Sequence, residues 1–284
     1  MKMNKILAGV LLGISLFGCY QSDPPMLNTN TDDFGRVGDS VRFAGRDWKV
    51  KIYENQKWGP GPNYFSGNPN DIYLDENGYL HMKIVQRNGE WYSTEIVSDE
   101  AMGYGRYTFT VEGDMEDLAS NTVLGLFTWD DETFKTDANS EVDIEISRWG
   151  NASDPYVLQF GVQPIFFGQL NEERMERPEY SIGKMNGVTN HTFIWTDSLI
   201  TWESYVGDTY GQGEILGTWR FDLTNPARVK EEGGNSSDPV IIPAPGDVTN
   251  ARINLWLHQQ PSSAPANGLP QEIIIRDFEY EPFG

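Results

Sequence analysis

The chain has 284 residues, and its 42 acidic and 21 basic residues give a formal net charge of −21 at pH 7. This charge argues against nucleic acid and anionic polysaccharides as partners, because both would be repelled, and it leaves a neutral glycan as the better electrostatic match. Solubility of an exposed protein explains the same charge. The single cysteine excludes a disulfide framework, and the three histidines lie too far apart in sequence to suggest a catalytic zinc.

The first residues resemble a bacterial export signal. Lys2 and Lys5 precede an apolar run over residues 6–17, which is too short to span a bilayer as a mature helix. The run ends in Leu-Phe-Gly-Cys, which resembles a lipobox, and Cys19 is the only cysteine of the chain. We therefore expect Cys19 to be lipidated; the alternative is a buried free thiol.

These observations divide the chain into three parts. Residues 1–19 are predicted to be a lipoprotein signal peptide, and residues 20–38, rich in Asp, Pro, Asn and Thr, a flexible tether. Residues 39–284 then form one domain. The expected location is the bacterial cell envelope, at the outer membrane or cell surface, with the protein held to the membrane by the lipid on Cys19.

Short alternating patterns between turn signals predict an all-β domain. Apolar residues alternate with polar ones over 80–84, 107–111 and 273–275, and Arg87-Asn-Gly-Glu90 predicts a two-residue hairpin turn. No segment has a sustained helical period with caps. We expect a sandwich or barrel of antiparallel strands. Two long stretches, 222–250 and 258–270, are expected to be loops that shape a binding face.

The most informative segment is Glu141-Val-Asp-Ile-Glu145. In a strand, its three carboxylates share one face, while the apolar residues between them point into a core. Folding alone does not favour three like charges on one face, since they repel. A solvated acidic strand is the alternative explanation of the pattern.

The spacing fits a glycosidase. Residues four apart on a strand are roughly 13 Å apart at Cα, and two glutamates that lean toward each other leave roughly 5 Å between carboxyls. A retaining glycosidase needs about 5–5.5 Å between its nucleophile and its acid/base. Crowding also separates the pKa values of the three groups, so that one ionises and another keeps its proton.

Several segments resemble glycoside hydrolase family 16, the family of lichenases, laminarinases and xyloglucan-active enzymes. These segments follow one another along the chain as Gly59-Pro-Gly-Pro-Asn-Tyr-Phe65, Gly103-Tyr-Gly-Arg-Tyr107, residues 124–131, Ser140 to Gly150, His191-Thr-Phe-Ile-Trp195 with Ile200-Thr-Trp202, and Asn254-Leu-Trp256. The resemblance runs from about residue 40 to the C-terminus. It implies a concanavalin-like jelly-roll sandwich of two antiparallel sheets with a concave substrate cleft.

The resemblance also implies roles for individual residues. Glu141 would be the nucleophile, Asp143 its assisting carboxylate and Glu145 the general acid/base. The substrate-binding residues would be Asn63, Glu95, Tyr104, Trp129, Asn254 and Trp256. Lichenases carry an arginine two residues after the position that matches Glu95, and Val97 stands there instead, which puts strict lichenase specificity in doubt.

The tryptophans divide between core and cleft. We expect Trp48, Trp91 and Trp195 in the core, and the resemblance places Trp129 and Trp256 in the cleft. Trp58 and Trp149 fit either place. No catalytic cofactor is expected. Related sandwiches often carry a structural calcium ion on the convex side, and Asp277 in the last strand is the candidate ligand.

Two functions follow from these observations. The first is a retaining endo-acting hydrolase of a neutral β-glucan with β-1,3 or mixed β-1,3/1,4 linkages, acting as a monomer. The second is a glycan-binding surface lipoprotein on the same scaffold, which captures glycans without cleaving them. Retention of all three carboxylates favours the hydrolase, since a binder gains nothing from their repulsion.

Overall fold

The structure is a computed structural model that describes residues 36–37, 39–165, 173–232, 235–259 and 262–283. The predicted signal peptide, Cys19 and most of the tether lie outside these residues. Within them, none of the helices is long and apolar enough to serve as a membrane span.

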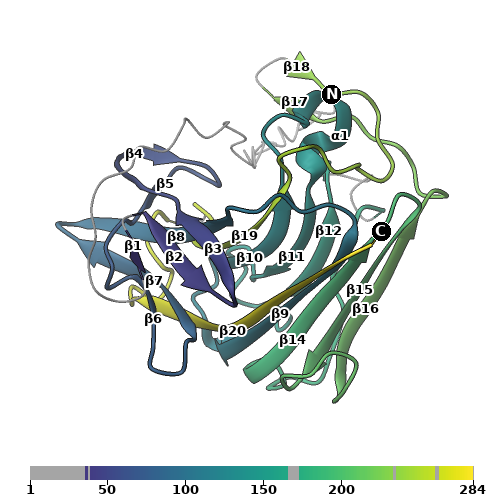
Figure 1. The fold of residues 1–284 in the computed structure, drawn as a ribbon. Helices are drawn as coiled ribbons and strands as arrows, with labels where there is room; N and C mark the ends of the chain where they lie inside the picture. The colour runs from purple at the N-terminus through teal and green to yellow at the C-terminus, as the bar shows by residue number, and fades with distance from the viewer. Residues whose placement is uncertain (1–35, 38, 166–172, 233–234, 260–261, 284) are drawn as a thin grey trace, which may run out of the picture.

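The first of two large sheets carries the acidic strand, and all its neighbouring strands are antiparallel (Figure 1). In spatial order its strands are β1 (Arg36–Val37), β2 (Ser40–Phe43), β3 (Arg46–Val50), β8 (Glu90–Ser98), β19 (Asn250–Leu257), β10 (Thr122–Trp129), β11 (Val142–Ile146), β12 (Leu158–Val162) and β13 (Met175–Glu176). The acidic strand is therefore central, with neighbours on both sides.

The second sheet packs against the first and is also antiparallel. In spatial order its strands are β6 (Ile72–Leu74), β7 (Leu80–Arg87), β20 (Gln271–Pro282), β9 (Gly105–Asp114), β14 (Asn186–Trp195), β15 (Leu199–Val206) and β16 (Ile215–Asp222). A bulge between Ile275 and Asp277 shifts the register of β20 against β9.

Few elements stand outside these two layers. The strand β5 (Asn63–Phe65) pairs with β8 in parallel, and β4 (Tyr53–Trp58) pairs with β5 antiparallel. The short pair β17 (Glu231–Glu232) and β18 (Asn235–Ser236) lies beside the helix α1 (Phe134–Asp137) in Figure 1. Two 3₁₀ turns, η1 (Met115–Asp117) and η2 (Ala138–Ser140), complete the described elements.

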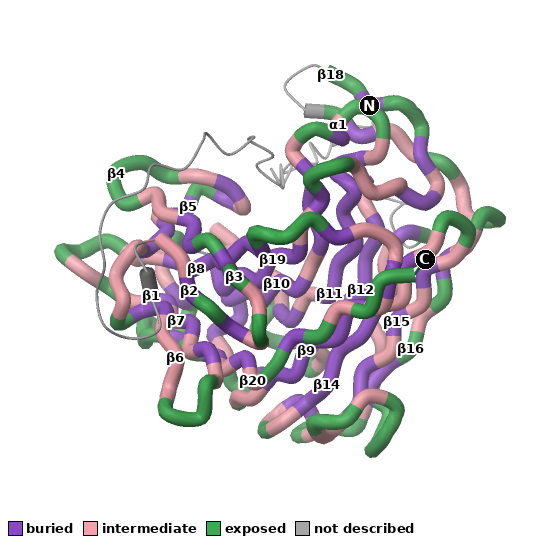
Figure 2. The backbone as a smooth tube through the Cα atoms, viewed as in Figure 1, coloured by how far each residue is buried: buried purple, intermediate pink, exposed green. Residues whose placement is uncertain are grey.

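The hydrophobic core lies between the sheets, because each strand turns its apolar alternate residues inward. Figure 2 shows buried positions concentrated on the central strands and exposed ones at β4 and the outer loops. Trp48 and Trp195 are fully buried, as predicted, and Trp91 is half-buried against the core. The predicted jelly-roll sandwich is confirmed, and so is the hairpin turn, where Arg87 pairs with Glu90 and both Asn88 and Gly89 have positive φ.

Candidate active site

The three acidic residues of the informative segment lie together on one face of β11. The apolar residues between them are fully buried in the core, so Asp143 and Glu145 point away from it, and Glu141, just before the strand, continues the series. We call Glu141, Asp143 and Glu145 the carboxylate row.

The register of the first sheet extends this face over five strands. One line of cross-strand partners is Glu95, Asn254, Gly125, Glu145 and Gln159, and the next is Val97, Arg252, Phe127, Asp143 and Gly161. Three strand spacings, roughly 14 Å in total, separate Glu95 from Glu145. The sheet thus places polar residues from β8, β19, β11 and β12 on one face, with Gly125 and Phe127 of β10 between them.

Glu145 has a neutral partner. Its Oε2 accepts a hydrogen bond of 2.8 Å from Gln159 Nε2, and Gln159 Oε1 in turn accepts from Arg177 at 3.3 Å. Burial, followed by the charge of Glu141, raises the pKa of Glu145 to about 8, although the Gln159 hydrogen bond and Arg177 act in the opposite direction. Glu145 therefore keeps its proton at neutral pH, as a general acid must.

Asp143 lies between the two glutamates and is buried. Gln163 Nε2 donates to its carboxylate at 3.2 Å, and the indole of Trp202 donates from the core side to its backbone oxygen at 3.0 Å. Burial, then the charges of Glu141 and Glu145, raises the pKa of Asp143 well above its usual range. Hydrogen bonds thus fix both the carboxylate and the backbone oxygen of Asp143.

Glu141 is bound by a buried cation. Lys230 Nζ lies 3.1 Å from Glu141 Oε2, and the Glu141 side chain is 10% exposed. An adjacent cation favours the ionised carboxylate. The row thus has a cation beside the carboxylate at one end and a carboxyl with a raised pKa at the other, an arrangement that fits acid-assisted displacement at a sugar.

Glu95 is the centre of a buried ion cluster. Lys51 Nζ lies 3.3 Å from both of its oxygens, Arg252 lies 3.5 Å away, and Asn254 Nδ2 donates at 3.3 Å. Arg252 is paired directly opposite Val97. A guanidinium therefore does reach Glu95, from the neighbouring strand and not from position 97.

At two glycines, neighbouring side chains leave no space for a Cβ. A Cβ at Gly125 would lie 2.5 Å from Asn254 Oδ1, and a Cβ at Gly161 would lie 2.8 Å from Ile165 Cδ1 and 3.3 Å from Asp143 Oδ2. Glycine inside a strand often marks a place where another group approaches closely. Both positions lie in the lines of partners that contain the carboxylate row.

The two predicted cleft tryptophans flank the row in different surroundings. Cations lie over the Trp129 ring, with Lys230 at 4.8 Å and Arg252 at 5.6 Å from its centroid, and its indole donates to Asp131 at 2.7 Å. Trp256 packs edge-on against Trp149, with ring centroids 6.1 Å apart. Both Trp129 and Trp256 are 8% exposed.

The other two predicted binding residues, Asn63 and Tyr104, contact backbone and core groups of the protein. Asn63 is buried and donates to the backbone oxygens of Pro60 at 2.8 Å and Leu257 at 2.9 Å. Tyr104 precedes β9 of the second sheet and packs edge-on against Trp195 at 5.3 Å. Their roles toward a sugar stay predictions.

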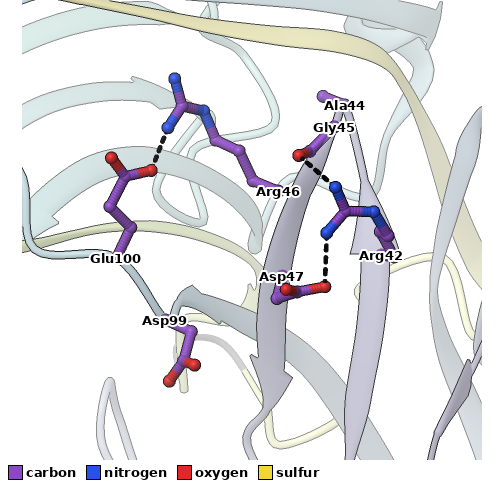
Figure 3. A pocket seen from close by; sticks show the side chains of 7 residues that line it. All are labelled: Arg42, Ala44, Gly45, Arg46, Asp47, Asp99 and Glu100. Atoms are coloured by element: carbon purple, nitrogen blue, oxygen red, sulfur yellow. Dashed lines mark hydrogen bonds and ion pairs between the residues drawn. The ribbon is translucent and has the colours of Figure 1, made fainter.

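A hollow of about 450 Å³ lies elsewhere, four strands from β11 (Figure 3). Its lining residues are Arg42, Ala44, Gly45, Arg46, Asp47, Asp99 and Glu100. Arg42 pairs with Asp47, and Arg46 pairs with Glu100. Both arginines that line the hollow are thus paired with acidic residues that also line it, and none of the lining residues belongs to the carboxylate row.

The calcium prediction gains no support from the side chains. Asp277 is exposed, and its Oδ1 accepts a hydrogen bond from the backbone N–H of Phe278 at 2.9 Å. Among the described residues, no group of three or more His, Cys, Asp or Glu could hold a metal ion. A calcium ion takes six to eight oxygen ligands, and backbone carbonyls are among them, so a structural calcium ion at Asp277 stays a prediction.

Six residues of this site escaped the sequence analysis: Gln159, Arg177, Lys230, Arg252, Lys51 and Gln163. The first two lie on or near strands that have no acidic pattern, and Arg252 is separated from Glu95 by 157 residues. For Lys230 the only signal was its place in the predicted long loop 222–250.

Comparison with family models finds no match, and comparison with curated proteins finds none either. Comparison with solved structures gives many similar folds. Bacillus licheniformis β-glucanase has a TM-score of 0.54 and 17% identity, over 83% of this chain and 92% of that one.

Two further structures show the range of proteins that have this fold. A Flavobacterium laminarinase has a TM-score of 0.56 and 12% identity, covering 82% of this chain and 92% of its own. A Mycobacterium tuberculosis protein described as an immunostimulatory antigen and pseudo β-1,3-glucanase has a TM-score of 0.57 and 15% identity, covering 84% and 91%. These likenesses show the fold of β-glucanases.

Proposed function

We propose that this chain is a retaining, endo-acting glycoside hydrolase that cleaves a neutral β-glucan with β-1,3 or mixed β-1,3/1,4 linkages. The observation that carries the proposal is the carboxylate row itself, in which a lysine binds Glu141 while Glu145, hydrogen-bonded to an amide, has a pKa of about 8. The β-glucanase fold supports the same conclusion.

The reaction is a double displacement. A Glu141 oxygen attacks the anomeric carbon and forms an ester, the glycosidic C–O bond breaks, and Glu145 gives its proton to the departing oxygen. Water then attacks the same carbon, Glu145 takes the proton from that water, and the ester bond breaks to restore ionised Glu141. Asp143, between them, stabilises the charge that moves along the row.

A second candidate function is glycan capture without cleavage. The observation that favours it is the ion pair on Glu141, because a carboxylate engaged by a buried ammonium is a weaker nucleophile. A pseudo β-1,3-glucanase is also among the similar structures. The two functions differ in one measurable property, release of reducing ends.

The deciding experiment uses protein without residues 1–19, incubated with laminarin, mixed-linkage glucan, xyloglucan and agarose. Reducing ends are measured for the wild type and for Glu141→Gln. We expect cleavage of laminarin or mixed-linkage glucan that the variant loses by at least about 1,000-fold, since it lacks the nucleophile. Binding to a glycan without any cleavage would favour capture instead.

For the cellular location we propose a lipid anchor at Cys19 in the bacterial cell envelope. The lipobox-like end of the apolar run supports this assignment. Cys19→Ser, expressed in a bacterial host, should move from the membrane fraction to the soluble fraction and lose incorporation of labelled palmitate. Equal membrane association of the two proteins would refute the anchor.

A further inference from the structure

Lys230 is buried against the carboxylate row and makes several polar contacts there. Its Nζ donates to Asn139 Oδ1 at 2.7 Å, to Glu141 Oε2 at 3.1 Å and to the backbone oxygen of Ala138 at 3.3 Å. The ammonium also lies 4.8 Å from the centroid of the Trp129 ring. Lysine is rarely so buried unless its charge is paired.

The chain segment that carries Lys230 is fixed onto the first sheet. Lys230 exchanges hydrogen bonds with Ser237, and the backbone N–H of Asp238 donates to the backbone oxygen of Lys135 in α1 at 2.6 Å. The buried guanidinium of Arg174 joins backbone oxygens of this segment to those at the end of β12, namely those of Val162, Gln163, Pro226, Val240 and Ile241. The lysine is thus held in place, not loosely extended.

Lys230 also stabilises an unusual turn. The three residues before Glu141 all have left-handed backbone conformations, with φ of 51° at Ala138, 65° at Asn139 and 53° at Ser140. Such conformations are unfavourable for residues other than glycine and persist only where the surroundings hold them. Two of the contacts of Lys230 go to this turn, so one cation binds both the carboxylate and the backbone that aims it.

The charges around Glu141 come from several elements. Asp143 and Glu145 lie on its own strand, Lys230 comes from the segment before β17, and the Arg252–Asp131 pair lies beyond Trp129. Of these groups, Lys230 contacts Glu141 directly, through an ion pair of 3.1 Å between Nζ and Oε2. A desolvated contact of this kind favours the charged carboxylate.

We propose that Lys230 is a positioning residue for Glu141, which keeps that carboxylate charged and fixes its orientation so that the row's protons stay on Asp143 and Glu145. The inference rests on the proposed function, because the charge matters if Glu141 is the nucleophile. Stabilising the carboxylate also makes it a better leaving group when the ester to the sugar breaks. Lys230 would therefore assist the second displacement at some expense to the first.

The first test reads the ionisation of Glu141 without any substrate. Carboxyl ¹³C resonances are titrated in the wild type, in Lys230→Met and in Lys230→Arg, with Glu141→Gln to assign the signal. We expect the Glu141 midpoint to rise by about one pH unit or more in the methionine variant and to stay close to the wild type in the arginine variant. An unchanged midpoint in the methionine variant would overturn the inference.

A matched control and a reciprocal measurement complete this test. Lys135→Met removes an exposed lysine of α1 and should leave the Glu141 midpoint where it is. Should Lys230→Met not fold, the Lys230 signal is titrated in Glu141→Gln, where loss of the counter-charge should lower its midpoint by about one unit, since coupling between two sites is reciprocal. A constant Lys230 midpoint would contradict the pairing.

Hydrolysis separates this inference from the proposed function. With laminarin, the acid limb of the kcat/KM profile should move to higher pH in Lys230→Met, with a loss of at least about tenfold at pH 5, and Lys230→Arg should restore most of it. If the wild type cleaves no glucan but the NMR midpoint moves, the proposed hydrolase fails and the role of Lys230 stands. If the wild type cleaves laminarin and Lys230→Met keeps its acid limb, the role of Lys230 fails and the hydrolase stands.

Discussion

Replacing Glu145 by glutamine should stabilise the protein while it abolishes hydrolysis. Gln159 Nε2 donates to Glu145 Oε2 at 2.8 Å, and a glutamine oxygen accepts the same hydrogen bond, so the packing is preserved. The gain in unfolding free energy comes from the ionisation of the Glu145 carboxyl. The Glu145 pKa rises from 4.5 to about 8 on folding, so at neutral pH the unfolded chain has lost a proton that the folded chain keeps.

The sign and size follow from this difference. Below pH 4.5 both states hold the proton and Glu145 adds no cost; above it the wild type loses stability by about 1.4 kcal/mol per pH unit until pH 8. At pH 7 the raised pKa of Glu145 lowers the unfolding free energy of the wild type by about 3.4 kcal/mol. Because Glu145 is partly exposed, solvent screening reduces this loss, and we expect the unfolding free energy of Glu145→Gln to be about 1–3 kcal/mol higher than that of the wild type.

Urea unfolding at pH 4.5, 7 and 8.5 measures this effect directly. The free-energy difference between variant and wild type should be smallest at pH 4.5 and should grow with pH. A difference that is constant over this range would refute the raised pKa, and a variant that is less stable at pH 8.5 would refute the reasoning as a whole. Far-ultraviolet circular dichroism at each pH checks that both proteins are folded.

Three further predictions concern Gly125, the buried His191 and the pH dependence of kcat/KM. Gly125→Ala should cost about 1–3 kcal/mol of stability and at least about tenfold in kcat/KM, because its Cβ would meet Asn254 Oδ1 at 2.5 Å. The control Gly103→Ala, whose Cβ has no neighbour nearer than 3.6 Å, should change both little in the same urea and laminarin assays. Burial lowers the pKa of His191 from 6.5 to about 3, so on acidification only the unfolded state binds a proton at this residue. Between pH 6 and 4.5, His191→Asn should therefore lose about 2 kcal/mol less unfolding free energy than the wild type. Equal losses in the two proteins would contradict this. Finally, kcat/KM of the wild type should fall above about pH 8 as Glu145 loses its proton, and a profile flat to pH 10 would exclude Glu145 as the acid.

The sequence predicts the layers of this fold better than the contacts between them. Alternation over 80–84, 107–111 and 141–146 reports directly which face of each strand turns toward the hydrophobic core, since the side-chain period of a strand is two. The two-residue turn at Asn88 and Gly89 is equally local, because both residues tolerate positive φ. Such features depend on neighbours in sequence and need no knowledge of the pairing.

The charges around the row depend on pairing between distant segments. Arg252 contacts Glu95 because β19 lies beside β8, and Lys230 reaches Glu141 because a loop 89 residues away folds over the turn before β11. No periodicity marks either residue. The sequence alone shows valine at position 97, where lichenases carry an arginine. That Arg252 brings a guanidinium to Glu95 from the neighbouring strand follows only from the register of β19 against β8.

The stereochemistry of the first product tests the central claim most directly. Proton NMR of laminarin or mixed-linkage glucan during the first minutes of hydrolysis shows which anomer is released before mutarotation. The account predicts the β-anomer, because two displacements at the same carbon through Glu141 retain the configuration. Release of the α-anomer would contradict the covalent role of Glu141, and the absence of any cleavage would contradict the hydrolase itself.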